Sequence, residues 1–223
     1  MSKPADFMLG LLDFFGVLLP GMIAAWLGWL HLPPDFKLAI EDARGEQATV
    51  MVWILFLFSS YALGHFVFGI AAKLDPVYDK WRKRTKKKDS NFLAATELRE
   101  RLTPKLASGD FSTLKWARTY VGIHSPASRL EIDRYEATSK FFRSMVVVSV
   151  ALALEFLLSS PNLVLATASV ACCALSVDRF FDQRWKMTEL TYASAIILKA
   201  TSPQQKAPTG SGQGAGSDAS ADT

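Results

Sequence analysis

The stretch SMVVVSVALALEFLLSSPNLVLATASVACCALSV, residues 144–177, contains two apolar segments that are separated by Pro161-Asn162. Its only charged side chain is Glu155. Two further apolar segments, residues 7–32 and 49–72, precede it in the chain. An α-helix needs about 20 apolar residues to cross a bilayer core of about 30 Å. The pattern therefore predicts an all-α membrane protein with four transmembrane helices.

The third and fourth apolar segments, residues 144–160 and 163–177, are short for a membrane span. They reach about 20 residues only if residues 141–143 and 178–181 are included. Arg143 and Arg179 must then extend their side chains to the lipid headgroups. A shallow hairpin that does not cross fully is the alternative.

The charges of the connecting loops predict the orientation in the membrane. Residues 73–143 contain 17 Lys and Arg against 9 Asp and Glu, a net charge of +8, whereas the loop 32–48 has a net charge of −2. Because positive loops stay in the cytoplasm, the long connection and both termini are expected there. We therefore expect a multi-pass protein of the bacterial inner (plasma) membrane.

Local signals divide the chain into four parts. Residues 1–72 form an N-terminal transmembrane hairpin, and residues 73–126 a basic cytoplasmic insert with two short helices near 92–102 and 112–121. Ser125-Pro126 is a typical helix start, and no Gly or Pro interrupts residues 127–159. The third and fourth helices of residues 127–200 therefore extend into the cytoplasm as a helical hairpin stalk. The Gly/Ser/Ala-rich residues 201–223 are expected to be a disordered tail.

Three polar residues in the apolar segments are candidates for an intramembrane site: Asp13, His65 and Glu155. A carboxylate within a bilayer is costly unless it is paired or hydrated. Asp13 and His65 have similar predicted depths, so they could line a path for protons or ions. A structural hydrogen bond between two helices, or hydration of Asp13 near the headgroups, explains them equally simply. Solvation at the outer membrane surface accounts for Glu155.

Gly16, Pro20 and Gly21 predict a kink in the first span, because Pro20 cannot donate to the carbonyl of Gly16. Ser60 and Gly64 in the second span form a small-residue surface suited to close helix packing, within one subunit or between copies. Arg143 and Asp178 are each about 17 residues from the hairpin tip at Ser160-Pro161. That equal spacing predicts an ion pair between them at the cytoplasmic interface.

A basic run follows the second span and has the sequence KWRKRTKKK, residues 80–88. Such a run attracts anionic lipid headgroups by about 1 kcal/mol per charge. We favour this lipid contact over nucleic acid, because Trp81 alone gives little aromatic surface for stacking bases. The basic residues are Lys80, Arg82, Lys83, Arg84, Lys86, Lys87 and Lys88.

Motifs of known enzymes are absent from the sequence. It contains no P-loop, GxSxG or HExxH pattern and no Cys/His cluster. We therefore expect no enzymatic activity, no cofactor and no metal site.

Two stretches resemble a family of small, uncharacterised bacterial inner-membrane proteins with four spans. They are DFFGVLLPG, residues 13–21, and RYEATSKFFRS, residues 134–144. Some proteins of this plan accompany phage-defence systems, in which a membrane subunit is triggered from the cytoplasm. The resemblance implies no assigned activity. Because helices that cross the membrane interface unbroken can carry motion into the bilayer, we expect a non-enzymatic, oligomeric, channel-like membrane effector controlled by a cytoplasmic protein or a small ligand. A passive scaffold that recruits a cytoplasmic partner and a small transporter are the alternative functions.

Overall fold

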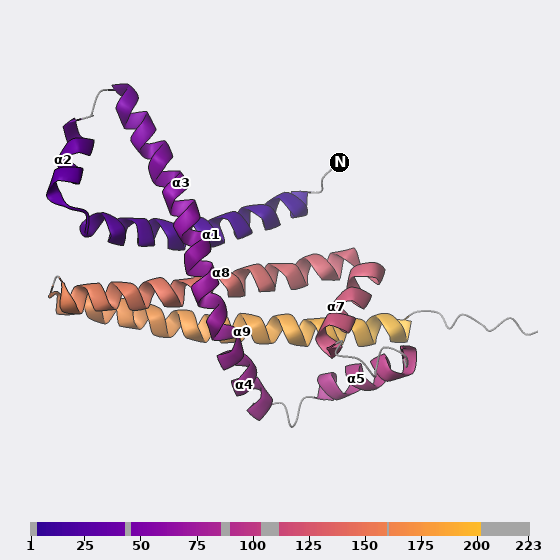
Figure 1. Cartoon of the computed structure of the whole chain (residues 1–223). Coiled ribbons are helices and arrows are strands. Elements are labelled where there is room, and N and C mark those ends of the chain that lie inside the picture. Colours follow the sequence, from indigo (N-terminus) through magenta and orange to yellow (C-terminus); the bar gives the residue numbers. More distant parts are fainter. Residues whose placement is uncertain (1–3, 43–45, 86–89, 104–111, 160, 202–223) are drawn as a thin grey trace, which may run out of the picture.

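The structure, a computed structural model, describes residues 4–42, 46–85, 90–103, 112–159 and 161–201, and all its regular elements are helices (Figure 1). The prediction of an all-α protein is therefore confirmed for this part of the chain. The helices, in chain order, are α1 (Pro4–Leu30), α2 (Pro34–Asp42), α3 (Glu46–Ala71), the 3-10 turn η1 (Ala72–Leu74), α4 (Asp75–Thr85), α5 (Ser90–Leu102), α7 (Thr113–His124), α8 (Pro126–Leu158) and α9 (Leu163–Thr201).

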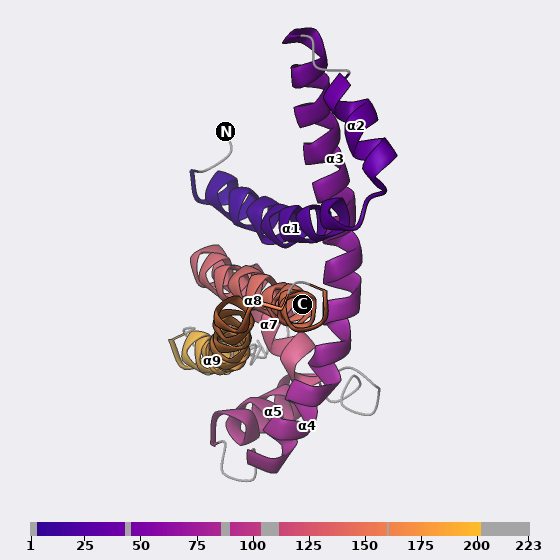
Figure 2. The ribbon, with the colours of Figure 1, turned by 90° about the vertical axis from the view of Figure 1, so that its left-hand side faces the viewer.

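The two longest helices, α8 and α9, lie side by side as an antiparallel pair (Figures 1 and 2). The predicted start of α8 is confirmed, because the Ser125 hydroxyl accepts a hydrogen bond from the Ser128 nitrogen and Pro126 occupies the first turn. α9 has 39 residues and is therefore about 58 Å long, well beyond a bilayer core. Both helices continue without a break from an apolar into a charged half.

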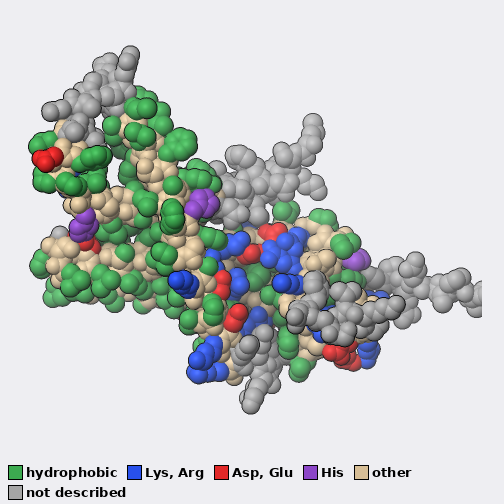
Figure 3. Space-filling view, viewed as in Figure 1, with side chains coloured by type: hydrophobic (Ala, Val, Ile, Leu, Met, Phe, Trp, Pro, Cys, Tyr) green, Lys and Arg blue, Asp and Glu red, His purple; other side chains and the backbone are tan. Residues whose placement is uncertain are grey.

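The apolar and charged halves lie at opposite ends of the pair. Residues 144–158 and 163–177 form the apolar half, next to the hairpin tip. Residues 126–143 and 178–201 form the charged half. Figure 3 shows hydrophobic side chains over the first region and over α3, and Lys, Arg, Asp and Glu over the second.

α1 lies along α8, whereas α3 crosses α1 and α8 steeply (Figures 1 and 2). The first half of α3 extends away from the other long helices. The side chains of α3 from Val50 to Ser59 are accordingly almost all exposed. The contact between α1 and α3 is closest at Gly21 and Gly64. A Cβ on Gly21 would lie 2.8 Å from the Gly64 nitrogen and would overlap the Ser60 carbonyl oxygen. The predicted packing role of Ser60 and Gly64 is therefore confirmed, within one subunit.

A compact core joins the two short helices α5 and α7 to the charged half of the pair. Its buried members come from all four helices: Ala95, Trp116, Ala117, Val121, Ile132, Met187, Tyr192 and Ala195. The predicted helices 92–102 and 112–121 correspond to α5 and α7, and Ser112 caps α7 by accepting from the Lys115 nitrogen. Burial against the long helices orders this segment, which is too short for a core of its own.

Three helical stretches of the described chain are long and apolar enough to cross a membrane: Val50–Arg82, Pro126–Leu158 and Leu163–Thr201. Within α1 the apolar stretch Gly16–Leu30 is shorter. These lengths are compatible with a membrane-embedded protein.

Candidate functional site

Arg143 is the centre of a buried ionic contact between α8 and α4. Its side chain is 5 % exposed, and its Nη1 donates to Asp75 Oδ2. Its guanidinium also lies 4.8 Å from the ring centroid of Phe68 in α3. The predicted pair of Arg143 with Asp178 is therefore wrong. Equal distance from the hairpin tip places Arg143 and Asp178 at the same height along the α8–α9 pair. Arg143, however, points toward α4, and Asp178 lies on an exposed face of α9.

The same contact changes the prediction that Arg143 reaches the lipid headgroups. A buried guanidinium neutralised by Asp75 has no need to extend into the headgroup region. The acidic partner belongs to a segment 68 residues away in sequence. The Arg143–Asp75 contact therefore connects the end of the apolar stretch of α3 to the point where α8 changes from charged to apolar.

Arg118 connects α7 to α8 through two carboxylates. Its Nη2 donates to Asp133 Oδ1 at 2.8 Å and also contacts Glu136. Asp133 and Glu136 also accept from Arg129, at 2.8 Å, and from Lys140, at 3.1 Å, each four residues away on α8. Partial burial alone would lower the pKa of Arg118, but the hydrogen bond to Asp133 and the charge of Glu136 raise it above its ordinary value. Arg118 is therefore held in its protonated form by its two carboxylate partners.

His65 lines a hollow of about 200 Å³ between α1, α3 and α8. Gly16, Phe68 and Lys140 are among its other lining residues. The His65 ring also meets the edge of the Tyr61 ring, with the centroids 4.7 Å apart. Asp13 belongs to α1, but its side chain lies outside the described part of the structure, so its predicted contact with His65 stays a prediction.

Glu155 pairs with His31 near the hairpin tip. The distance from His31 Nε2 to Glu155 Oε2 is 2.7 Å, with side chains 59 % and 9 % exposed. The prediction that solvent alone accounts for Glu155 is therefore wrong, because the carboxylate is buried and has a protein partner. The contact joins the end of α1 to the end of α8, which places these two helix ends at the same level.

The three residues predicted to kink the first span lie within one continuous helix, α1. Gly21 has a clear packing role, because the backbone of α3 occupies the place of a side chain there. Gly16 faces α8, where a Cβ would lie 3.8 Å from the Phe141 Cβ, an ordinary contact. Pro20 is buried beside them. The two glycines therefore face two different neighbouring helices.

The predicted lipid-binding run divides into different environments. Arg82 is buried, with its guanidinium carbon 5.5 Å from the ring centroid of Trp185 and 5.7 Å from that of Tyr192. It packs on aromatic side chains of α9, so its assignment to a lipid-facing patch is wrong. Lys80 and Arg84 are exposed. The remaining members lie outside the described side chains: Lys83, Lys86, Lys87 and Lys88.

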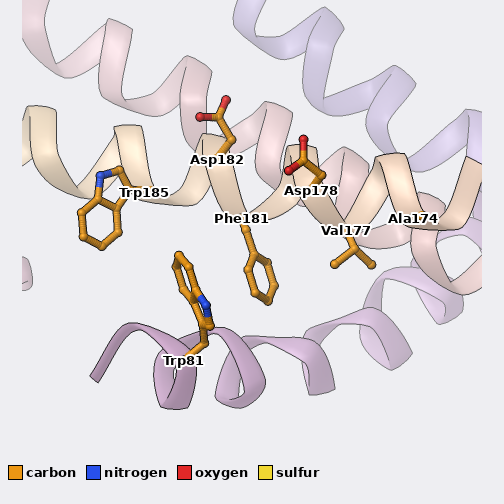
Figure 4. Close-up of a pocket in the computed structure, with 7 residues that line it drawn as sticks. All are labelled: Trp81, Ala174, Val177, Asp178, Phe181, Asp182 and Trp185. Atoms are coloured by element: carbon orange, nitrogen blue, oxygen red, sulfur yellow. The ribbon is translucent and has the colours of Figure 1, made fainter. Parts of the chain in front are cut away.

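A second, larger hollow of about 750 Å³ lies where α4 meets α9. Figure 4 shows the rings of Trp81, Phe181 and Trp185 along one side of it and the carboxylates of Asp178 and Asp182 along the other. Its position is the junction between the apolar and charged halves of α9. Asp178 was predicted to pair with Arg143 instead, and no sequence pattern indicated this hollow.

Two residues that these sites need were missed in the sequence, Asp75 and His31. Asp75 directly follows the second span in the segment KLDP, and its position at a predicted membrane surface was the available signal. His31 lies at the end of the first apolar segment and was an available signal for the same reason. Acidic and basic residues at span ends can pair across helices, but the sequence does not indicate which helix ends are neighbours.

The comparisons with known proteins give no match: no family model, curated protein or solved structure is similar to this chain. The described residues also contain no group of three or more His, Cys, Asp or Glu side chains that could hold a metal ion. The functional argument therefore rests on the arrangement of the helices and their charged contacts.

Proposed function

We propose that the chain is a non-enzymatic, oligomeric membrane effector controlled by its cytoplasmic helices. In this proposal α1, α3, α8 and α9 are the four spans of a bacterial inner-membrane protein, which requires α3 to turn from its steep crossing toward the direction of the other three. The charged half of the α8–α9 pair is the cytoplasmic stalk, with α5 and α7 packed against it. Residues 13–21 and 134–144 resemble small inner-membrane proteins, some of which accompany phage-defence systems, and this supports a trigger in the cytoplasm.

One observation carries the proposal: α8 and α9 are unbroken from the core with α5 and α7 to the apolar half. A helix is stiff along its axis, so a rotation or shift imposed at one end moves the other end. A ligand or protein that rearranged α5 and α7 would act on both long helices at once. The movement would reach the apolar half without a hinge.

The charged contacts supply the connections that such a movement needs. Arg118 couples α7 to α8, and Arg143 couples α8 to the start of α4. Because only the 3-10 turn η1 separates α4 from α3, a shift of α8 is also passed to α3. Charge pairs with low solvent exposure rearrange between discrete partners rather than stretching. These contacts therefore favour a two-state response.

The test measures membrane potential and dye entry in bacteria that express the chain at controlled levels, with and without phage challenge. We expect depolarisation in the wild type after challenge and a reduced response in Arg118→Ala. Arg101→Ala is the matched control, since among the described residues Arg101 pairs only with the exposed Glu97 on its own helix. His65→Ala tests whether the hollow between α1, α3 and α8 belongs to the conducting path.

Three results would contradict parts of the proposal. Intact membranes throughout, at verified expression and with the neighbouring genes present, would favour the passive scaffold. Equal responses of Arg118→Ala and wild type would exclude control through α7. Crosslinking in membranes that showed only monomers before and after challenge would exclude the oligomeric effector.

A further inference from the structure

The hollow between α4 and α9 has the composition of a site for an organic cation. Trp81 and Phe181 have ring centroids 5.1 Å apart, and Trp81 and Trp185 have theirs 6.2 Å apart, so the three rings form one aromatic surface (Figure 4). Aromatic faces attract cations electrostatically. A volume of about 750 Å³ lies within the range of small-molecule sites.

The two carboxylates of the hollow are not equivalent. Asp182 accepts from Lys186 Nζ at 2.8 Å, so its charge is balanced within α9. Asp178 has no ion-pair or hydrogen-bond partner among the described residues, and its side chain is exposed. An unbalanced negative charge beside an aromatic surface selects a positive group over a neutral or negative one.

The position of the hollow indicates where the cation comes from. Ala174 and Val177 line its apolar end, and Val170 continues the same exposed face of α9 toward the hairpin tip. This face belongs to a stretch apolar enough to cross a membrane. A hydrocarbon chain lying on it would leave its polar head at Asp178, one turn beyond Ala174.

We propose that the hollow binds a bilayer lipid whose headgroup carries an ammonium group. The ammonium lies between the Asp178 carboxylate and the ring of Phe181, and one acyl chain follows the face of Ala174 and Val177. This inference depends on the membrane placement proposed above, but not on an effector activity.

Lipid retention by the purified full chain tests the proposal. The chain is reconstituted in nanodiscs with equal parts of phosphatidylethanolamine and phosphatidylglycerol, released into mild detergent, and analysed by native mass spectrometry. We expect retained phosphatidylethanolamine to exceed phosphatidylglycerol about tenfold, a difference of about 1.4 kcal/mol. Asp178→Asn should remove this preference. Asp79→Asn, on the exposed surface of α4 two residues before Trp81, should keep it.

A competition experiment tests the same site without any substitution. Dodecyltrimethylammonium below its micellar concentration should displace the bound phosphatidylethanolamine, whereas dodecyl sulfate, with the same tail and opposite charge, should not. Displacement by both would indicate an apolar groove without charge selection and would overturn the proposal. Equal retention of the two lipids by the wild type, or an unchanged preference in Asp178→Asn, would also overturn it. None of these results depends on membrane depolarisation.

Discussion

Replacing Asp75 by Asn tests the reassigned partner of Arg143 most directly. Arg143 is 5 % exposed and Asp75 is 29 % exposed, so the substitution leaves a buried guanidinium without its counter-ion. Breaking a buried pair in this way costs about 3–5 kcal/mol. Two effects reduce that cost. Water can reach the partly exposed Asp75 side of the contact. The ring of Phe68, 4.8 Å from the Arg143 guanidinium, also attracts the positive charge. We therefore expect a loss of about 2–3 kcal/mol in the free energy of unfolding.

The assay is reversible unfolding in detergent micelles, followed by circular dichroism as the fraction of sodium dodecyl sulfate is raised. Asp178→Asn is the matched control, because it removes the same charge from the residue that hairpin spacing alone would pair with Arg143. Its loss should be below about 0.5 kcal/mol, typical of an exposed site. Adding Arg143→Met to Asp75→Asn should restore most of the stability, since an apolar side chain of similar length needs no counter-ion.

Equal losses in Asp75→Asn and Asp178→Asn, or a loss in Asp178→Asn alone, would contradict the pairing of Arg143 with Asp75. Either result would mean that Arg143 faces α9 rather than α4. Failure of Arg143→Met to rescue Asp75→Asn would show that Asp75 contributes through something other than this pair.

Three further substitutions test other contacts. Gly64→Val should separate α3 from α1, because a Cβ at this position would overlap the Val17 backbone. Gly69→Val is the control, since a Cβ there meets nothing within 4 Å. A spin-label distance between α1 and α3 should increase in Gly64→Val and stay unchanged in Gly69→Val. Arg118→Ala should cost about 1.5–3 kcal/mol and raise amide hydrogen exchange in α7, while Arg101→Ala, exposed and paired within one helix, should cost less than about 0.5 kcal/mol. Trp116→Ala removes a buried ring and should release α7 at a cost of about 3 kcal/mol, measured as faster proteolysis between α7 and α5.

Contacts within a helix were predictable because they depend on residues a few positions apart. The Ser125-Pro126 start and the pairs Arg129–Asp133 and Glu136–Lys140 follow from the local geometry of one helix turn. The limits of α8 and α9 followed from the absence of Gly and Pro and from the turn at Pro161. The cytoplasmic position of the charged half stays a prediction, because charge counts alone support it.

Contacts between helices were predicted less well, and the misassigned Arg82 shows why. In sequence it belongs to a uniform basic run, and only the docking of α4 on α9 brings it against Trp185 and Tyr192. The sequence of one helix shows which faces are apolar, but not which neighbour each face meets. A basic residue with a long side chain is compatible with both a lipid surface and an aromatic partner.

By itself, the sequence determined the helical content, the apolar stretches and the boundary between the apolar and charged halves. The physical reason is that backbone hydrogen bonds in a helix join residues four positions apart. The free energy of moving an apolar stretch from water into a bilayer likewise depends on the composition of that stretch alone. Only the tertiary structure decided that Arg143 pairs with Asp75, that His31 pairs with Glu155, and that α3 crosses α1 at Gly21. These contacts depend on the rotation and crossing of whole helices, which close packing of distant segments sets.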